Sequence, residues 1–141
     1  MPTPAQLRAF LQGGETLEFT VTGNSMGAAL PPGTLVRVTG RAPRLGEWAL
    51  YDCGDGAAVH RIVWVRGERR YQLGDAEPAG TWITPAELLG TAEQRQLPGR
   101  AWAREPVRAR ALALLRAWVK LLVRKVRGGR AGRESRVASR E

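Results

Sequence analysis

Turn-forming residues divide the first 97 residues of this chain into short segments, and this spacing constrains the fold more than any other feature. The 141 residues include 17 Gly and nine Pro, which form turns and end regular structure. Between the turns lie short alternating runs, many of them β-branched, which is typical of strands with one buried face. The runs that predict strands are residues 16–22, 34–38, 47–51, 57–65 and 69–73, with shorter extended pieces at 81–84 and 90–94.

Two short helical pieces accompany these strands. Residues 4–11 can form an amphipathic helix, which Gly13-Gly14 would stop. Residues 85–89 predict a helical turn with Thr84 as its N-cap and a Pro at the first helical position. Together with five or six strands, these pieces indicate a compact, mostly β domain of short antiparallel strands.

The chain divides into three predicted segments. Residues 1–97 form the β domain, and Leu97-Pro98-Gly99 marks its end. Residues 98–128 contain a basic amphipathic helix over 106–127, because apolar side chains recur there at helical spacing. Gly128-Gly129 is expected to end this helix. Residues 129–141 are charged or small and have almost nothing to bury, so we expect a disordered basic tail.

The net charge of +9 belongs to the C-terminal end of the chain. Residues 100–141 hold 13 Lys and Arg against three Glu, a net charge of +10, so residues 1–99 are close to neutral. No apolar run follows a basic start, and none approaches the roughly 20 residues of a membrane span. We therefore expect a cytoplasmic protein that can also lie at the periphery of a membrane.

A small polar corner, Gly23-Asn24-Ser25-Met26, separates two of the predicted strands. Gly, Asn and Ser dominate turns for purely local reasons, so the corner can be a simple polar turn. A Ser on a tight turn between strands is also one way to present a nucleophilic hydroxyl. Other residues of the chain must decide between these two interpretations.

A serine nucleophile needs a base, and His60 is the available one. It is the only His of the chain, and residues 1–99 contain no Lys. Alternation along the predicted strand places His60 and Ile62 on one face and Arg61 on the other. A carboxylate that orients the His completes such a site. Asp75 is the candidate, because it lies where the next strand opens into a loop.

Four sequence motifs occur in the order and spacing of one known superfamily. They are Gly23-Asn24-Ser25-Met26 with Leu30 and Pro32-Gly33, Gly46-Glu47-Trp48-Ala49, His60-Arg61-Ile62-Val63, and Gly74-Asp75 with Leu89-Gly90. In this pattern the chain resembles the signal-peptidase-like and LexA-like serine peptidases (the S24/S26 type). A His in the third motif is similar to the Ser-His branch of signal peptidase I, whereas the bacterial housekeeping branch has Lys there.

The resemblance implies a serine endopeptidase that cleaves a precursor peptide or a leader or signal segment. It assigns Ser25 as the nucleophile, His60 as the general base and Asp75 as the orienting acid. Gly23, Asn24 and Met26 would surround the nucleophile in the substrate and oxyanion site, together with the Ser25 backbone N–H. It implies no cofactor and no metal.

Some positions depart from the superfamily pattern. Ala28 lies where a Pro soon after the Met is expected, Thr34 follows the Pro-Gly turn in place of an Asp, and Gly80 or Thr81 replaces a second acidic residue. An alternative function is therefore a catalytically weak or inactive binding module on the same fold, which its basic helix tethers to a membrane surface or a partner. A self-processing regulator is disfavoured, because no helix-turn-helix precedes the domain.

The basic helix itself has three interpretations. It can pack its apolar stripe on the β domain or on a second copy of the chain, which would make a homo-oligomer. It can lie in a membrane interface, with Trp102 and Trp118 at headgroup level and its basic side chains towards anionic lipid. A nucleic-acid partner is not expected, because charge alone supports it and no binding motif is present.

Overall fold

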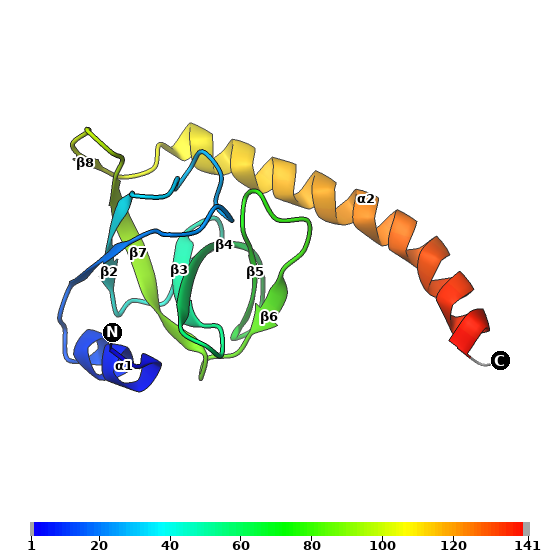
Figure 1. The fold of residues 1–141 in the computed structure, drawn as a ribbon, viewed down its shortest axis with the longest axis horizontal. Helices are drawn as coiled ribbons and strands as arrows, with labels where there is room; N and C mark the ends of the chain where they lie inside the picture. The colour runs from blue at the N-terminus through cyan, green and yellow to red at the C-terminus, as the bar shows by residue number, and fades with distance from the viewer. Residues whose placement is uncertain (1, 140–141) are drawn as a thin grey trace.

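The computed structural model describes residues 2–139 of the chain, and side chains for residues 2–127. Over this part the chain forms a mostly β domain followed by a long C-terminal helix, α2 (Figure 1). The elements are α1 (Pro4–Gln12), β1 (Leu17–Thr20), β2 (Leu35–Thr39), β3 (Trp48–Asp52), β4 (Ala57–Arg66), β5 (Arg69–Leu73), β6 (Thr81–Ile83), β7 (Leu88–Gln96), β8 (Trp102–Ala103) and α2 (Val107–Ser139).

All strands belong to one antiparallel sheet with the order β1-β2-β7-β3-β4-β5-β6, and β8 pairs with β7. Figure 1 shows that the sheet curls strongly and that α1 lies near one of its ends. The prediction of a mostly β fold of short antiparallel strands with a C-terminal helix is confirmed.

The predicted helical turn after Thr84 is only partly present. The Glu87 carboxylate accepts hydrogen bonds from the Thr84 backbone N–H and hydroxyl, and the Glu87 N–H donates to the Thr84 carbonyl. Leu88 and Leu89 already belong to β7, so the turn ends two residues earlier than predicted. The strand is favoured over the helical turn here because Leu88 pairs with Tyr51 of β3 and the Leu89 side chain is buried in the core.

The first helix is anchored at its start and through its apolar side. Thr3 and Gln6 form a capping box, in which each side chain accepts from the other residue's backbone N–H. Leu7 and Leu11 are both buried and belong to the main core cluster. This cluster also contains Met26, the residue after Ser25, so the Met26 side chain anchors the corner Gly23-Asn24-Ser25-Met26 in the core.

An extra residue in β4 forms part of the surface on which α2 packs. Ile62 pairs with Gln72 and Trp64 pairs with Tyr71, so Val63 is inserted as a β-bulge. The bulge turns Val63 and Trp64 towards the helix. Val63 is buried with Ala117 of α2, and its carbonyl accepts a hydrogen bond of 2.7 Å from the Trp118 indole.

The C-terminal helix differs from its prediction in two respects. It continues past Gly128-Gly129, which were expected to end it. Its apolar side chains do not form one stripe against the sheet: Leu114 and Leu121 pack there, whereas Leu115 and Leu122 are exposed. The predicted disordered tail over 129–141 falls on residues whose side chains, and at the end whose backbone, lie outside the described part.

Within residues 2–139, no helix combines the length and the apolar content that crossing a membrane requires.

Candidate active site

The fold brings Ser25 and His60 together, although 35 residues separate them in the sequence. The Ser25 Oγ lies 2.7 Å from the His60 Nε2, which is hydrogen-bond distance. The pair is partly buried, and only 12% of the His60 side chain is exposed. A nucleophile and its base must meet in this way for the base to remove the hydroxyl proton.

The Ser25 corner is a series of tight turns held by one buried side chain. The Gly27 N–H donates to the Asn24 carbonyl, and Gly27 has a φ of +55°, a conformation that favours glycine. The Met26 side chain is 1% exposed and packs in the main core. Because Met26 points inward, Ser25 beside it is held at the surface of the domain.

The three residues expected to surround the nucleophile therefore differ in their placement. Gly23 and Asn24 are exposed, and a Cβ at Gly23 would have no neighbour within 4 Å. This leaves open space on that side of Ser25. The Met26 side chain is part of the core, which corrects the expectation that it contacts substrate; only its backbone remains for that role.

His60 is held by two side chains at its second nitrogen. The Gln72 Oε1 lies 2.6 Å and the Tyr51 hydroxyl 3.0 Å from the His60 Nδ1. Alternation explains this arrangement. Gln72 pairs with Ile62, which shares a face with His60, and Ala49 pairs with His60 and shares a face with Tyr51.

Gln72 selects the tautomer that a general base needs. Its amide N–H donates to the Thr81 hydroxyl at 2.9 Å, so its carbonyl oxygen faces His60. A carbonyl oxygen only accepts hydrogen bonds, so the His60 Nδ1 carries the proton and donates it to Gln72. The Nε2 lone pair is then free to accept the proton of the Ser25 hydroxyl.

Tyr51 stays a neutral hydrogen-bonding group in this site. Burial raises its pKa to about 12, and the negative charges of nearby acidic groups add to this effect. The phenol therefore keeps its proton over the whole range in which a His base works. It contributes position and packing against His60, with ring centroids 5.7 Å apart, but no charge.

Asp75 binds Arg61, not His60, which corrects the expectation that it orients the base. Its two carboxylate oxygens accept from the Arg61 Nε and Nη2, both at 2.8 Å. Arg61 is fully buried, and Glu105 also accepts two bonds from its guanidinium, at 2.6 and 2.8 Å. Arg61 follows His60 on β4, so its side chain lies on the opposite face of the sheet.

The loop that Asp75 begins still supports the nucleophile, through its backbone. The Ala76 N–H donates to the Ser25 carbonyl at 2.9 Å. Gly74 lies so close to this carbonyl that a Cβ would be 2.5 Å from the oxygen, which explains the requirement for Gly at this position. Lys120 of α2 donates to the Asp75 and Glu77 carbonyls, so the helix also fixes the loop.

Glu77 is the acidic residue nearest to the reactive pair. One of its carboxylate oxygens lies 4.0 Å from the His60 Nε2, and 40% of its side chain is exposed. This distance is too long for a hydrogen bond but short enough for a favourable interaction with a protonated His. No sequence pattern singles out Glu77, which reads as an ordinary charged residue of an exposed loop.

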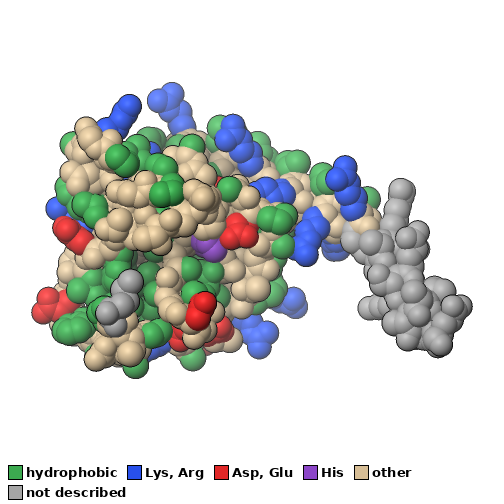
Figure 2. Space-filling model, viewed as in Figure 1, with side chains coloured by type: hydrophobic (Ala, Val, Ile, Leu, Met, Phe, Trp, Pro, Cys, Tyr) green, Lys and Arg blue, Asp and Glu red, His purple; other side chains and the backbone are tan. Residues whose placement is uncertain are grey.

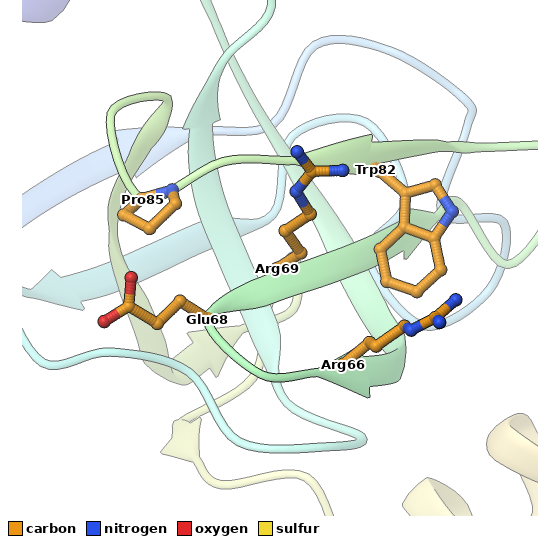
Figure 3. A pocket seen from close by; sticks show the side chains of 5 residues that line it. All are labelled: Arg66, Glu68, Arg69, Trp82 and Pro85. Atoms are coloured by element: carbon orange, nitrogen blue, oxygen red, sulfur yellow. The ribbon is translucent and has the colours of Figure 1, made fainter.

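A groove of about 340 Å³ lies beside the corner. The turn from Met26 to Ala29 forms one wall, and Ala109, Leu112 and Ala113 of α2 form the other. Arg61, Asp75 and Glu105 also line it, whereas Ser25 and His60 do not. A larger groove of about 670 Å³ is lined by Arg66, Glu68, Arg69, Trp82 and Pro85 and includes none of the residues described above (Figure 3).

Within the described residues, no group of three or more His, Cys, Asp or Glu side chains could hold a metal ion. Four residues with clear roles were missed in the sequence: Gln72, Tyr51, Glu77 and Glu105. Only the face alternation of β3 and β5 could have pointed to Gln72 and Tyr51.

A scan against models of protein families and a search of curated proteins gave no match for this chain.

Proposed function

We propose that the protein is a serine endopeptidase of the signal-peptidase-like type, with Ser25 as its nucleophile and His60 as its general base. The observation that carries this proposal is the 2.7 Å contact between the Ser25 Oγ and the His60 Nε2. The order of motifs described above supports it. The substrate class it implies is a precursor peptide or a leader or signal segment.

The reaction begins with attack of the Ser25 oxygen on the scissile carbonyl while its proton passes to the His60 Nε2. The tetrahedral intermediate collapses to an acyl-enzyme, and His60 returns the proton to the leaving amine. Water then attacks the ester, with His60 again acting as base, and Ser25 is regenerated. Throughout, the His60 Nδ1–H donates to Gln72, and the nearby Glu77 carboxylate stabilises the imidazolium.

The Ser25 backbone N–H supports charge stabilisation in the intermediate. Among residues 2–139, no backbone carbonyl accepts a hydrogen bond from it. It is therefore available to the oxyanion that develops on the substrate carbonyl. Gly23 has no side chain, so it supplies no hydroxyl donor to the same oxyanion.

The first prediction is that Ser25→Ala and His60→Ala each abolish cleavage. A serine nucleophile cannot be replaced by a methyl group, and loss of its base typically lowers the rate by roughly 10²- to 10⁴-fold. The measurement is mass-spectrometric identification of cut sites in a library of peptides. Thr22→Ala, at an exposed neighbouring position, is the matched control and should cleave like the wild type. Cleavage retained in Ser25→Ala would contradict the proposal.

One observation favours the alternative of a weak or inactive binding module. The group at the His60 Nδ1 is a neutral amide, which orients the imidazole but stabilises its charged form less than a carboxylate does. The same peptide library separates the two functions. A binding module would retain peptides equally in wild type and Ser25→Ala, with no cut sites in either.

A further inference from the structure

The inner side of α2 holds the helix to the β domain through a narrow set of contacts. Leu114, Ala117 and Leu121 pack against the cluster around Val63 and Leu73. The Trp118 indole N–H and the Lys120 ammonium add hydrogen bonds to backbone carbonyls of the domain. These contacts occupy one side of the helix and leave the opposite side to solvent.

The opposite side is apolar, which is unusual for the solvent face of a surface helix. We call it the outer face, and it consists of Leu115, Val119, Leu122, Val123 and Val126. Leu115, Val119, Leu122 and Val126 are spaced four, three and four residues apart, and their exposed fractions are 54, 53, 63 and 58%. A continuous exposed stripe of this kind indicates a surface that another apolar phase covers.

The charge around the outer face selects the kind of partner. Residues 107–127 contain seven Lys and Arg and no acidic residue. With 3.6 residues per turn, Arg116 and Arg127 lie along one edge of the outer face and Lys125 along the other. Figure 2 shows basic side chains distributed along this part of the helix. A second copy would bring like charges together, whereas an anionic surface would neutralise them.

Aromatic residues extend the outer face onto the sheet. Trp118 makes an edge contact with Trp64, with ring centroids 6.1 Å apart, and Trp64 is 53% exposed. Trp64 pairs with Tyr71 and Tyr71 with Trp82, so these rings share one face of β4, β5 and β6. Arg66 and Trp82 border the same groove, where Figure 3 shows them close together. Exposed Trp beside Arg is typical of protein surfaces at the headgroup level of a bilayer.

We propose that the outer face, with Trp118 and Trp64, docks the protein on an anionic lipid bilayer. The helix lies in the plane of the interface, with its apolar side chains among the acyl chains and its basic edges at the headgroups. The Ser25–His60 pair takes no part in this contact, so the inference stands independently of the proposed function.

The test is co-sedimentation of the full chain with vesicles of phosphatidylcholine alone and of phosphatidylcholine with phosphatidylglycerol. We expect binding to the anionic vesicles, at least ten-fold weaker binding to the neutral ones, and weakening with salt, because surface attraction of basic residues is screened. Trp emission should shift to shorter wavelength on binding, because the indoles leave water.

Two variants examine the apolar and basic components separately. Leu115→Ser with Leu122→Ser should weaken binding at least ten-fold, and Lys125→Glu with Arg127→Glu should do so on anionic vesicles only. Phe10→Ser with Leu45→Ser is the matched control, because both residues are exposed and apolar but lie outside α2, on α1 and in the loop before β3. Circular dichroism checks that each variant is folded.

Failure of the wild type to bind anionic vesicles would overturn the proposal. Equal binding by the Leu115→Ser, Leu122→Ser variant would overturn it as well. A concentration-dependent dimer that this variant abolishes, with no vesicle binding, would instead assign the outer face to a second copy.

Discussion

Two adjacent residues of β4, His60 and Arg61, look into very different surroundings. At its Nδ1, His60 contacts only neutral groups, which are the Gln72 amide and the Tyr51 phenol. Arg61, on the other face, is buried and meets two carboxylates, those of Asp75 and Glu105. The Asp75 carboxylate, which was expected beside His60, therefore binds Arg61 on the opposite face of β4.

The difference follows from the cost of burying charge. A guanidinium is always charged, so full burial is tolerated only when its donors are bound by carboxylates and carbonyls. Here Asp75, Glu105 and the Gly46 carbonyl supply these acceptors. A His base can be buried as a neutral ring and needs only one fixed tautomer. An amide is sufficient for that, and Asp75 and Glu105 bind Arg61 instead.

The largest effect should come from breaking the charged side. Arg61→Leu removes the partner of the partly exposed Asp75 carboxylate and leaves the buried Glu105 with only Arg110, 3.9 Å away, which should lower the free energy of unfolding by about 3–5 kcal/mol. Urea denaturation measures this change. Glu18→Gln is the matched control, because its pair with Arg37 is exposed and the loss of that pair should cost about 1 kcal/mol or less. Equal losses in the two variants would contradict the larger contribution of the buried ionic group.

The neutral side should respond in rate rather than in stability. Gln72→Leu removes the acceptor that fixes the Nδ1 proton, so kcat should fall by roughly 100-fold, within the range of general-base contributions. Gln72→Glu restores an acceptor and adds a charge. A carboxylate favours the protonated ring. As the pH is lowered, the Gln72→Glu enzyme should therefore lose activity at a higher pH than the wild type does. A Gln72→Leu enzyme with unchanged kcat would show that the amide does not position His60.

Asp75→Asn tests whether Asp75 stabilises the buried Arg61 or takes part in catalysis with His60. The amide keeps one acceptor for Arg61 but loses the charge, so the free energy of unfolding should fall by about 1–3 kcal/mol. Cleavage measured well below the unfolding transition should stay within roughly ten-fold of wild type, since Asp75 does not contact His60. A loss of cleavage as large as that of His60→Ala, with unchanged stability, would contradict this assignment.

The smallest effect concerns a more exposed ionic cluster, in which Arg41 binds Glu47 and Glu93. Hydrogen bonding from Arg41 lowers the pKa of Glu93 below its ordinary value near 4.5. A carboxyl whose pKa is lowered by folding adds stability above its unfolded pKa and loses it as pH falls through the folded pKa. Glu93→Gln should therefore cost about 1 kcal/mol at pH 7 and progressively less below pH ~4.5. A cost that is constant with pH in denaturation curves would contradict the ionic origin.

Local patterns of the sequence predicted the strands well, because turns and alternation are encoded in neighbouring residues. The meeting of Ser25 and His60 could be expected only from the order of motifs along the chain. The partner of Arg61 could not, because Glu105 is 44 residues away and sits just before a helix that reads as a separate segment. The two-sided character of α2 was missed because periodicity shows that a helix is amphipathic but not which of its apolar residues meet the domain.

The bulge at Val63 has a consequence for chain length. Without the extra residue, β4 and β5 could pair in a regular register, with Trp64 still opposite Tyr71. The insertion adds a buried side chain that packs with Ala117 and a carbonyl that accepts a hydrogen bond from the Trp118 indole. The inserted residue thus serves the helix and not the sheet. We expect β4 of related domains to be one residue shorter where α2 is absent, so that insertion and helix are gained and lost together.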